Sequence, residues 1–204
     1  AIFLLAVFEE KRAWRPLLDF YSDASGLGDY VTGDLATMDL AWVLARVHDG
    51  GDIEPLIGLI ERPVLDCAVR NAAADALWLL VRDGKVDRGV ALRHMQGIFQ
   101  RLIPADGVVD DEDTGFWTFL SQTACHFQAP ELTLEVERCF ALGLIDERFF
   151  NRADMTAALA MTEAAIEEEY RPRDRIDNLG DYLSNGIGFF LPYGLQPCER
   201  ARDL

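Results

Sequence analysis

The sequence predicts an all-α solenoid, in which antiparallel helix pairs stack side by side. Apolar residues recur at helical spacing along most of the chain, and proline and glycine separate the runs. Prolines and tryptophans recur at a period near 37–39. Pro16 and Pro55 are 39 residues apart, Trp42 and Trp78 are 36 apart, and Trp117 follows Trp78 by 39. Two helices fill a period of this length, as they do in helical repeat proteins.

The clearest unit of this repeat is a helical hairpin over residues 52–84. Pro55 stands in a first turn, where its missing N–H costs nothing, and Pro63 ends that helix. Asp66 is expected to cap the second helix, whose apolar stripe stops at Asp83-Gly84. Neither helix can bury its stripe alone, so the unit must pack against neighbouring hairpins.

The residues before this hairpin predict helices separated by one loop. Residues 3–21 form two helical pieces that meet near Lys11 and Arg12 or at Pro16. Residues 22–33 contain three glycines and are expected to form a loop, since no strand-and-helix phosphate pattern follows them. Residues 34–47 form the next helix, which ends in a His-Asp-Gly-Gly turn.

The residues after the hairpin continue the alternation. Residues 104–115 form the longest polar connection, and the second helices of the four hairpins are expected over 34–47, 65–82, 115–127 and 153–170. Their partners include helices over residues 87–103 and 130–142. The repeat domain therefore covers residues 1–170. Residues 171–204 form a C-terminal tail expected to pack on the last repeat.

Composition excludes several classes of partner. The formal net charge is −16, and residues 105–204 hold 8 Lys and Arg against 20 Asp and Glu. An acidic chain without a basic stripe is a poor candidate for binding nucleic acid or an anionic membrane. No apolar run reaches the roughly 18 residues that a membrane span needs. The cysteines lie far apart, which indicates reduced thiols in a cytoplasm: Cys67, Cys125, Cys139 and Cys198.

The beginning of the chain looks like the middle of a helix. Residues 1–8 are amphipathic and start at Ala1, so we expect that residues upstream have been cut away. The run is too short for a signal peptide and lacks its basic flank.

The histidines and cysteines do not form a recognisable catalytic or metal-binding pattern. No two histidines have the i, i+4 spacing of a helix-borne metal site. Cys125 and His126 are adjacent, so on a helix they point about 100° apart and do not form a nucleophile pair. The histidines are expected at surfaces or helix caps: His48, His94 and His126.

The acidic run that begins at Asp110 invites a calcium interpretation, which fails. A glycine falls at the sixth position, but the twelfth is serine instead of a bidentate glutamate. We instead expect these acids at a helix N-terminus, where they favour the helix dipole. No Walker loop, nucleophile elbow or dinucleotide fingerprint is present. The sequence therefore predicts no catalytic residue, no cofactor and no metal.

The central hairpin resembles a HEAT repeat. Pro55 stands in its first helix, and Asp66, Val69-Arg70 and paired alanines stand in its second. This resemblance implies a right-handed α-α superhelix, HEAT/armadillo-like, of about four hairpins, with Asp66 and Arg70 in a structural ladder. The order of elements over residues 1–170 is similar to an uncharacterised bacterial family of HEAT-like proteins, a domain of unknown function. Some members end in a SEC-C zinc motif, which is absent here, since Cys198 is the only cysteine in the tail.

These observations favour a non-catalytic scaffold for protein–protein interaction with an acidic binding surface. Its partner is expected to be a basic protein, not nucleic acid or a membrane. The alternative is an enzyme or ligand carrier with a pocket in the concave face, using carboxylates with Cys125 or a histidine. The candidate partner-binding residues are Asp110, Asp111, Glu112, Asp113, Glu163 and Glu167.

Overall fold

The computed structural model describes residues 2–23, 25–33, 35–104, 108–109, 111–162, 164–166 and 168. These residues form eleven α-helices and one 3-10 helix, with no strand among them, so the predicted all-α class is confirmed. The elements in chain order are α1 (Ile2–Val7), η1 (Lys11–Ala13), α2 (Trp14–Tyr21), α3 (Leu27–Thr32), α4 (Leu35–Met38), α5 (Leu40–Val47), α6 (Glu54–Ile60), α7 (Cys67–Arg82), α8 (Arg88–Leu102), α9 (Asp111–His126), α10 (Pro130–Leu142) and α11 (Arg152–Ala160).

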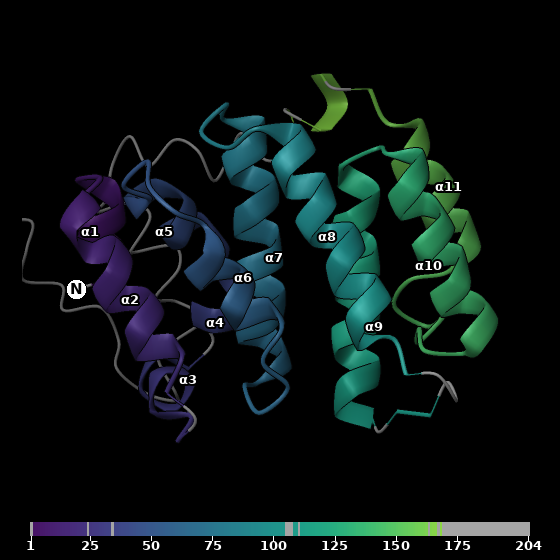
Figure 1. The fold of residues 1–204 in the computed structure, drawn as a ribbon, viewed down its shortest axis with the longest axis horizontal. Coiled ribbons are helices and arrows are strands. Elements are labelled where there is room, and N and C mark those ends of the chain that lie inside the picture. The colour runs from purple at the N-terminus through teal and green to yellow at the C-terminus, as the bar shows by residue number, and fades with distance from the viewer. Residues whose placement is uncertain are drawn as a thin grey trace, which may run out of the picture.

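Eight of these helices fall into two rows. α7 packs between α5 and α9, and α11 packs on α9, so these four helices contact one another in succession. In the other row, α2 contacts α6 and α8 contacts α10. The helices follow one another in chain order along the longest axis of the molecule (Figure 1). The stacking of these helices as the hairpins of a solenoid, and their superhelical coiling, stay predictions.

The helix boundaries that depend on local sequence are confirmed. Pro55 lies in the first turn of α6, and Pro130 opens α10. The carboxylate of Asp66 caps α7 by accepting the backbone N–H of Ala68 at 2.7 Å. Gly84 follows the end of α7 with a φ of +67°, a conformation that costs glycine little.

Two of the three spaced tryptophans make the same contact. Trp42 lies in the first half of α5 and Trp78 in the second half of α7, but an arginine four residues later lies over each ring, at 5.6 and 5.7 Å. Trp117 differs, because the residue four positions later is a serine and its ring packs against Phe116. The third tryptophan therefore does not mark the same position of the repeat.

The predicted loop over residues 22–33 is wrong, because it contains α3. A Cβ atom at Gly28 would lie 2.9 Å from the carbonyl oxygen of Phe20, so only glycine allows α3 to pack this closely on α2. The hydroxyl of Tyr21 donates to Thr32 at 3.0 Å and ties the two helices together. Tertiary packing thus forms this helix, despite its glycines.

Two predicted helices are shorter than expected. The helix over residues 34–47 breaks at Asp39, whose φ of −135° leaves the helical region, and the break lets α4 pack on both α5 and α7. The helix over 153–170 ends at Ala160, since Met161 is extended with a ψ of 138°. Residues 171–204 lie outside the described part of the chain, so the division into domain and tail stays a prediction.

Arg70 connects three helices from inside the core. Its side chain is only 4% exposed, and its Nε donates to the carbonyl of Ile60 at 3.0 Å, at the end of α6. Its guanidinium lies 3.4 Å from the centre of the Phe116 ring and donates to Asp113 of α9, also at 3.4 Å. Arg70 therefore fixes α9 relative to the hairpin of α6 and α7.

Replacing Arg70 by methionine is expected to lower the free energy of unfolding by about 2–4 kcal/mol. The change keeps an apolar stem but removes the partner of a buried carbonyl and the stacked cation. Urea unfolding measures the difference. Arg93→Met is the matched control, since Arg93 is exposed on α8 and its loss should cost less than about 0.5 kcal/mol. Equal losses in the two variants would contradict the structural role of Arg70.

Candidate functional site

Helix α7 presents two different faces. Ala73, Leu77 and Leu80 lie on the buried face and are inaccessible to solvent. The opposite face is a strip that helical geometry forms from positions i, i+1, i+4, i+5 and i+8. This strip consists of Cys67, Ala68, Asn71, Ala72 and Asp75.

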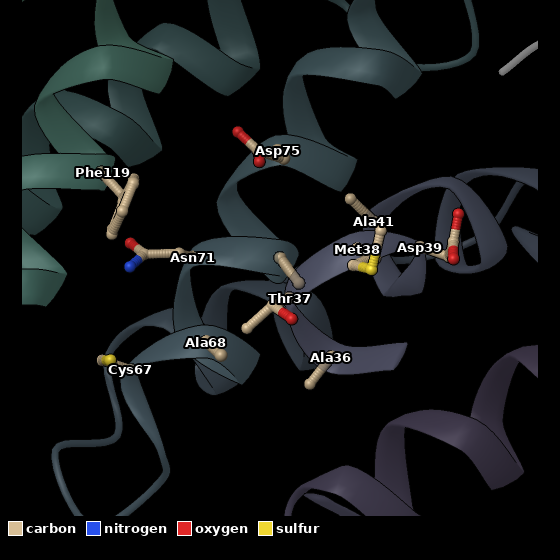
Figure 2. Close-up of a pocket in the computed structure, with 11 residues that line it drawn as sticks. Ala36, Thr37, Met38, Asp39, Ala41, Cys67, Ala68, Asn71, Asp75 and Phe119 are labelled. Carbon is tan, nitrogen blue, oxygen red and sulfur yellow. The ribbon is translucent and has the colours of Figure 1, made fainter. Parts of the chain in front are cut away.

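This strip is the floor of a groove with a volume of about 180 Å³, which we call the α7 groove. Helix α4 and the start of α5 flank it on one side, and Phe119 of α9 flanks it on the other (Figure 2). Three stretches that are far apart in the sequence therefore meet here. The groove is lined by Ala36, Thr37, Met38, Asp39, Ala41, Cys67, Ala68, Asn71, Ala72, Asp75 and Phe119.

Large apolar side chains stand on both walls of the groove. Met38 is 48% exposed and Phe119 is 45% exposed, so both walls offer apolar surface that solvent can reach. The break at Asp39 separates α4 from α5, and Met38 is the last residue of α4. Alanines at 68 and 72 keep the floor low between the walls. The groove can therefore receive an apolar group.

Asn71 supplies the unusual polar group of the groove. Its side chain is 8% exposed, and neither amide atom has a hydrogen-bond partner among the described residues. In Figure 2 the amide lies on the side of α7 that faces Phe119. A buried amide without partners costs about 1–3 kcal/mol. Such a cost is typical of a group that serves binding, so Asn71 marks this groove as the candidate site.

The charged residues of the groove are both acidic. Asp39 lies between α4 and α5, and Asp75 lies one helical turn after Asn71. The hydroxyl of Thr123 donates to Asp75, which orients this carboxylate from α9. No lysine, arginine or histidine is among the described residues that line the groove. Its electrostatic potential therefore favours a cationic group.

The thiols differ in their access to solvent. Cys67 is partly exposed and lines the groove, whereas Cys125 and Cys139 are buried in the core. Burial raises the pKa of Cys125 and of Cys139 to about 12, because a thiolate is poorly solvated there. Burial and a raised pKa therefore disfavour these two thiols as nucleophiles at neutral pH.

A second cavity of about 370 Å³ lies at the other end of α7 and is more polar. Arg82, Arg88 and Gln128 line it together with the rings of Trp78 and His126. Its groups hold the structure together, since the indole of Trp78 donates to the carbonyl of His126 and Arg88 donates to the carbonyl of Phe127. Burial lowers the pKa of His126 to about 4, so this ring is neutral at physiological pH.

One of the expected histidine caps is confirmed. His48 stands at the C-cap of α5, where its Nδ1 accepts the backbone N–H of Gly50, and it is buried, with its ring 4.8 Å from that of Trp14. His94 is partly exposed and its Nε2 lies 3.7 Å from the Glu54 carboxylate.

Within the described residues, no group of three or more His, Cys, Asp or Glu side chains could hold a metal ion. None of the described helices is both long and apolar enough to cross a membrane.

Asp113, the one predicted partner-binding residue whose side chain the structure describes, does not line the α7 groove. It lies in the first turn of α9 and binds Arg70, as described above. Asp111 and Glu112 belong to the same helical turn. Asp110, Glu163 and Glu167 lie outside the described residues, so their role stays a prediction.

Sequence reasoning missed Met38, Asn71 and Phe119 as site residues. Met38 and Phe119 stand among other apolar residues in predicted helices, and nothing in the sequence there indicates a groove. Asn71 carried a signal, since it is a polar residue within an alanine-rich helix, on the strip opposite the buried face. Its place in a groove depends on α4 and α9, and local periodicity cannot predict those contacts.

Comparison with known proteins finds relatives without an assigned function. A family model described as "Protein of unknown function (DUF1186)" matches residues 1–185. An uncharacterised protein of Chlamydia muridarum (strain MoPn / Nigg) is 28% identical over 180 residues, which are 87% of this chain and 69% of that protein. An uncharacterised protein of Chlamydia trachomatis serovar D is 29% identical over 169 residues, which are 83% of this chain. The match covers 61% of the latter protein, so this chain spans less than two thirds of its length. No solved structure matches the chain.

Iodoacetamide is expected to label Cys67 in the folded protein well before Cys125 or Cys139. The thiolate is the reactive form, and Cys125 and Cys139 are disfavoured both by burial from the reagent and by the raised pKa of their thiols, whereas Cys67 is partly exposed. Mass spectrometry of peptides from a short time course measures each site separately. In denaturant, the three sites should react alike, which serves as the control. Equal labelling in the folded state would contradict the open position of Cys67.

Proposed function

The chain belongs to the DUF1186 family of proteins of unknown function, and we propose that it is a non-catalytic scaffold that binds a basic protein partner. The observation that carries this proposal is the α7 groove, which combines two carboxylates and an unsatisfied amide with no lining cation among the described residues. Such a groove offers apolar, acidic and amide contacts to a partner. Contact, not catalysis, is therefore the proposed mechanism.

The architecture supports a binding role. The helices α5, α7, α9 and α11 pack in succession, as the inner row of a repeat protein does. We propose that the hairpins coil into a right-handed, HEAT-like superhelix and that the groove lies on its concave face. A scaffold of this kind would act in the cytoplasm, where the thiols stay reduced.

The charge of the chain supports a basic partner. The net charge of −16 attracts cationic surfaces over distances longer than a contact. We propose that the acids around the start of α9 and after α11 add to this attraction. Asp113 contributes less to it, because its carboxylate also binds Arg70. The remaining members of this set are Asp110, Asp111, Glu112, Glu163 and Glu167.

The size of the groove favours a scaffold over a carrier of a small ligand. Pockets that enclose a drug-sized ligand have volumes of about 300–1,000 Å³, whereas the groove measures about 180 Å³. It has room for a side chain of a longer partner. The second cavity is larger, but Trp78, Arg88 and Gln128 on its walls donate to backbone carbonyls, and Arg82 binds the carboxylate of Asp83.

Filling the groove is expected to reduce partner binding. Ala68→Trp places a large ring on the floor of the groove, and the Asp66 cap does not depend on the side chain of residue 68. The wild-type protein and this variant are immobilised, exposed to lysate of the source organism and washed at low and high salt. We expect a stoichiometric basic protein on the wild type, released by salt and lost from the variant. Its identity is read by mass spectrometry.

Leu134→Trp is the matched control, because Leu134 is 72% exposed on α10 in the other row. Both variants must retain the thermal midpoint of the wild type for the comparison to count. Equal capture by Ala68→Trp and wild type would contradict the role of the groove. A tightly held metabolite, displaced by Ala68→Trp in the absence of any protein partner, would instead establish the ligand carrier.

A further inference from the structure

The amide of Asn71 restricts what the α7 groove can bind. An asparagine side chain offers one acceptor and two donors close together. A ligand that satisfies both amide atoms must present a donor and an acceptor side by side. One residue of an extended peptide does so, since its N–H and C=O point to the same side, as in a hydrogen-bonded pair of β-strands.

Adenine also presents such a pair, but its usual biological forms carry phosphates. A phosphate would lie near Asp39 and Asp75, and no described cation in the groove could neutralise it. The same carboxylates favour a peptide that bears a lysine or arginine. The charges of the groove thus distinguish between two ligands that the amide alone would accept.

The spacing along α7 matches the repeat of an extended chain. Asn71 and Asp75 are four residues apart, so they are separated by about 6 Å along the helix axis. Side chains on one side of an extended peptide repeat every two residues, about 6.6–6.8 Å. A peptide that runs along α7 can therefore place one residue at Asn71 and the next but one at Asp75. A carboxylate accepts several hydrogen bonds at once, so the bond from Thr123 is compatible with a bound arginine.

The walls account for the remaining specificity. Met38 and Phe119 expose apolar surface on opposite sides of the floor. An apolar side chain that entered between them would bury this surface. Its residue would then lie next to the Asn71 amide, which can bind the main chain only at close approach.

We propose that the α7 groove binds an extended peptide segment with an apolar residue two positions from an arginine or lysine, and that Asn71 binds its main chain. This inference rests on the proposed scaffold function and names the part of the partner that the groove receives. The apolar side chain lies between Met38 and Phe119, and the cation lies at Asp75 or Asp39.

The test uses a fluorescein-labelled peptide with the segment Leu-Ser-Arg in a Gly-Ser background. Its affinity for the full chain is measured by fluorescence anisotropy at low salt. Asn71→Leu should weaken binding about tenfold, the effect of losing two ordinary hydrogen bonds at close to 1 kcal/mol each less some compensation. Gln100→Leu, an exposed amide on α8, is the matched control and should leave the affinity unchanged. A peptide with glutamate in place of arginine should not bind.

A main-chain variant of the peptide separates recognition by Asn71 from mere packing. N-methylation of the leucine nitrogen removes the peptide N–H that would donate to the side-chain oxygen of Asn71. It should weaken binding to the wild type about tenfold and cause little further loss in Asn71→Leu. Equal losses in both proteins would overturn the main-chain role. The thermal midpoint adds a second readout, since removal of an unsatisfied amide should leave it unchanged or raise it. A lower midpoint in Asn71→Leu would assign the residue a structural role and overturn the inference.

The peptide experiment and the Ala68→Trp capture fail independently. If a basic protein is captured and lost on filling the groove, but no Leu-Ser-Arg peptide binds, the extended-peptide inference is wrong and the scaffold stands. If neither protein nor peptide depends on the groove, both proposals are wrong. Binding of the peptide that is unaffected by Ala68→Trp would place it elsewhere and likewise overturn the inference.

Discussion

The buried guanidinium of Arg70 is the interaction on which the centre of the molecule depends. A charged group removed from water is tolerated only with partners, and those of Arg70 come from the end of α6, the first turn of α9 and the ring of Phe116. The hairpin of α6 and α7 thus cannot move relative to α9 without exposing this charge or separating it from its partners. Phe119 lies further along α9, so the same contact also fixes one wall of the α7 groove. The contacts of Arg70 therefore position both the helices of the core and one wall of the groove.

Helix α7 serves the core with one face and the groove with the other, and its small residues make both possible. Alanines 73, 74 and 76 are fully buried and allow neighbouring helices to approach closely. On the other face, alanines 68 and 72 keep the floor open. Asn71 is the exception to this pattern. Leucine or alanine at this position would avoid the cost of a buried amide without a partner. Residues that break a local rule at a cost in stability tend to lie at functional sites, which is how we interpret Asn71.

The sequence predicts those parts of the fold that depend on neighbouring residues. The cap at Asp66, the prolines that open α6 and α10 and the ends of α7 follow from local hydrogen bonding and backbone geometry. α3 and the break at Asp39 were missed, since the packing of α3 on α2 and of α4 on α7 decides them. The burial of His48 was missed for the same reason, because the ring that covers it belongs to Trp14.

The candidate site was less predictable than the fold. Charge clustering drew attention to the acids at the start of α9, where the one side chain described, that of Asp113, binds Arg70. The α7 groove combines residues from three separate stretches, and no periodicity connects Met38 with Phe119. A polar residue in an alanine-rich helix was visible at position 71. Only the structure shows that its amide lacks a partner among the described residues.

In the proposed scaffold, net charge and groove chemistry act at different distances, and this difference determines what each can select. The field of a chain with a charge of −16 extends about 8 Å at physiological ionic strength, so in this proposal it speeds the encounter with basic proteins without distinguishing among them. The groove acts only on contact, and the amide of Asn71 requires a donor and an acceptor in a fixed geometry. A basic surface without an extended segment would meet the protein but leave that amide unsatisfied. An extended apolar segment without a cation would satisfy the amide but arrive slowly. Selectivity therefore requires both features in one segment, so two carboxylates beside one unsatisfied amide are more informative than the larger charge elsewhere.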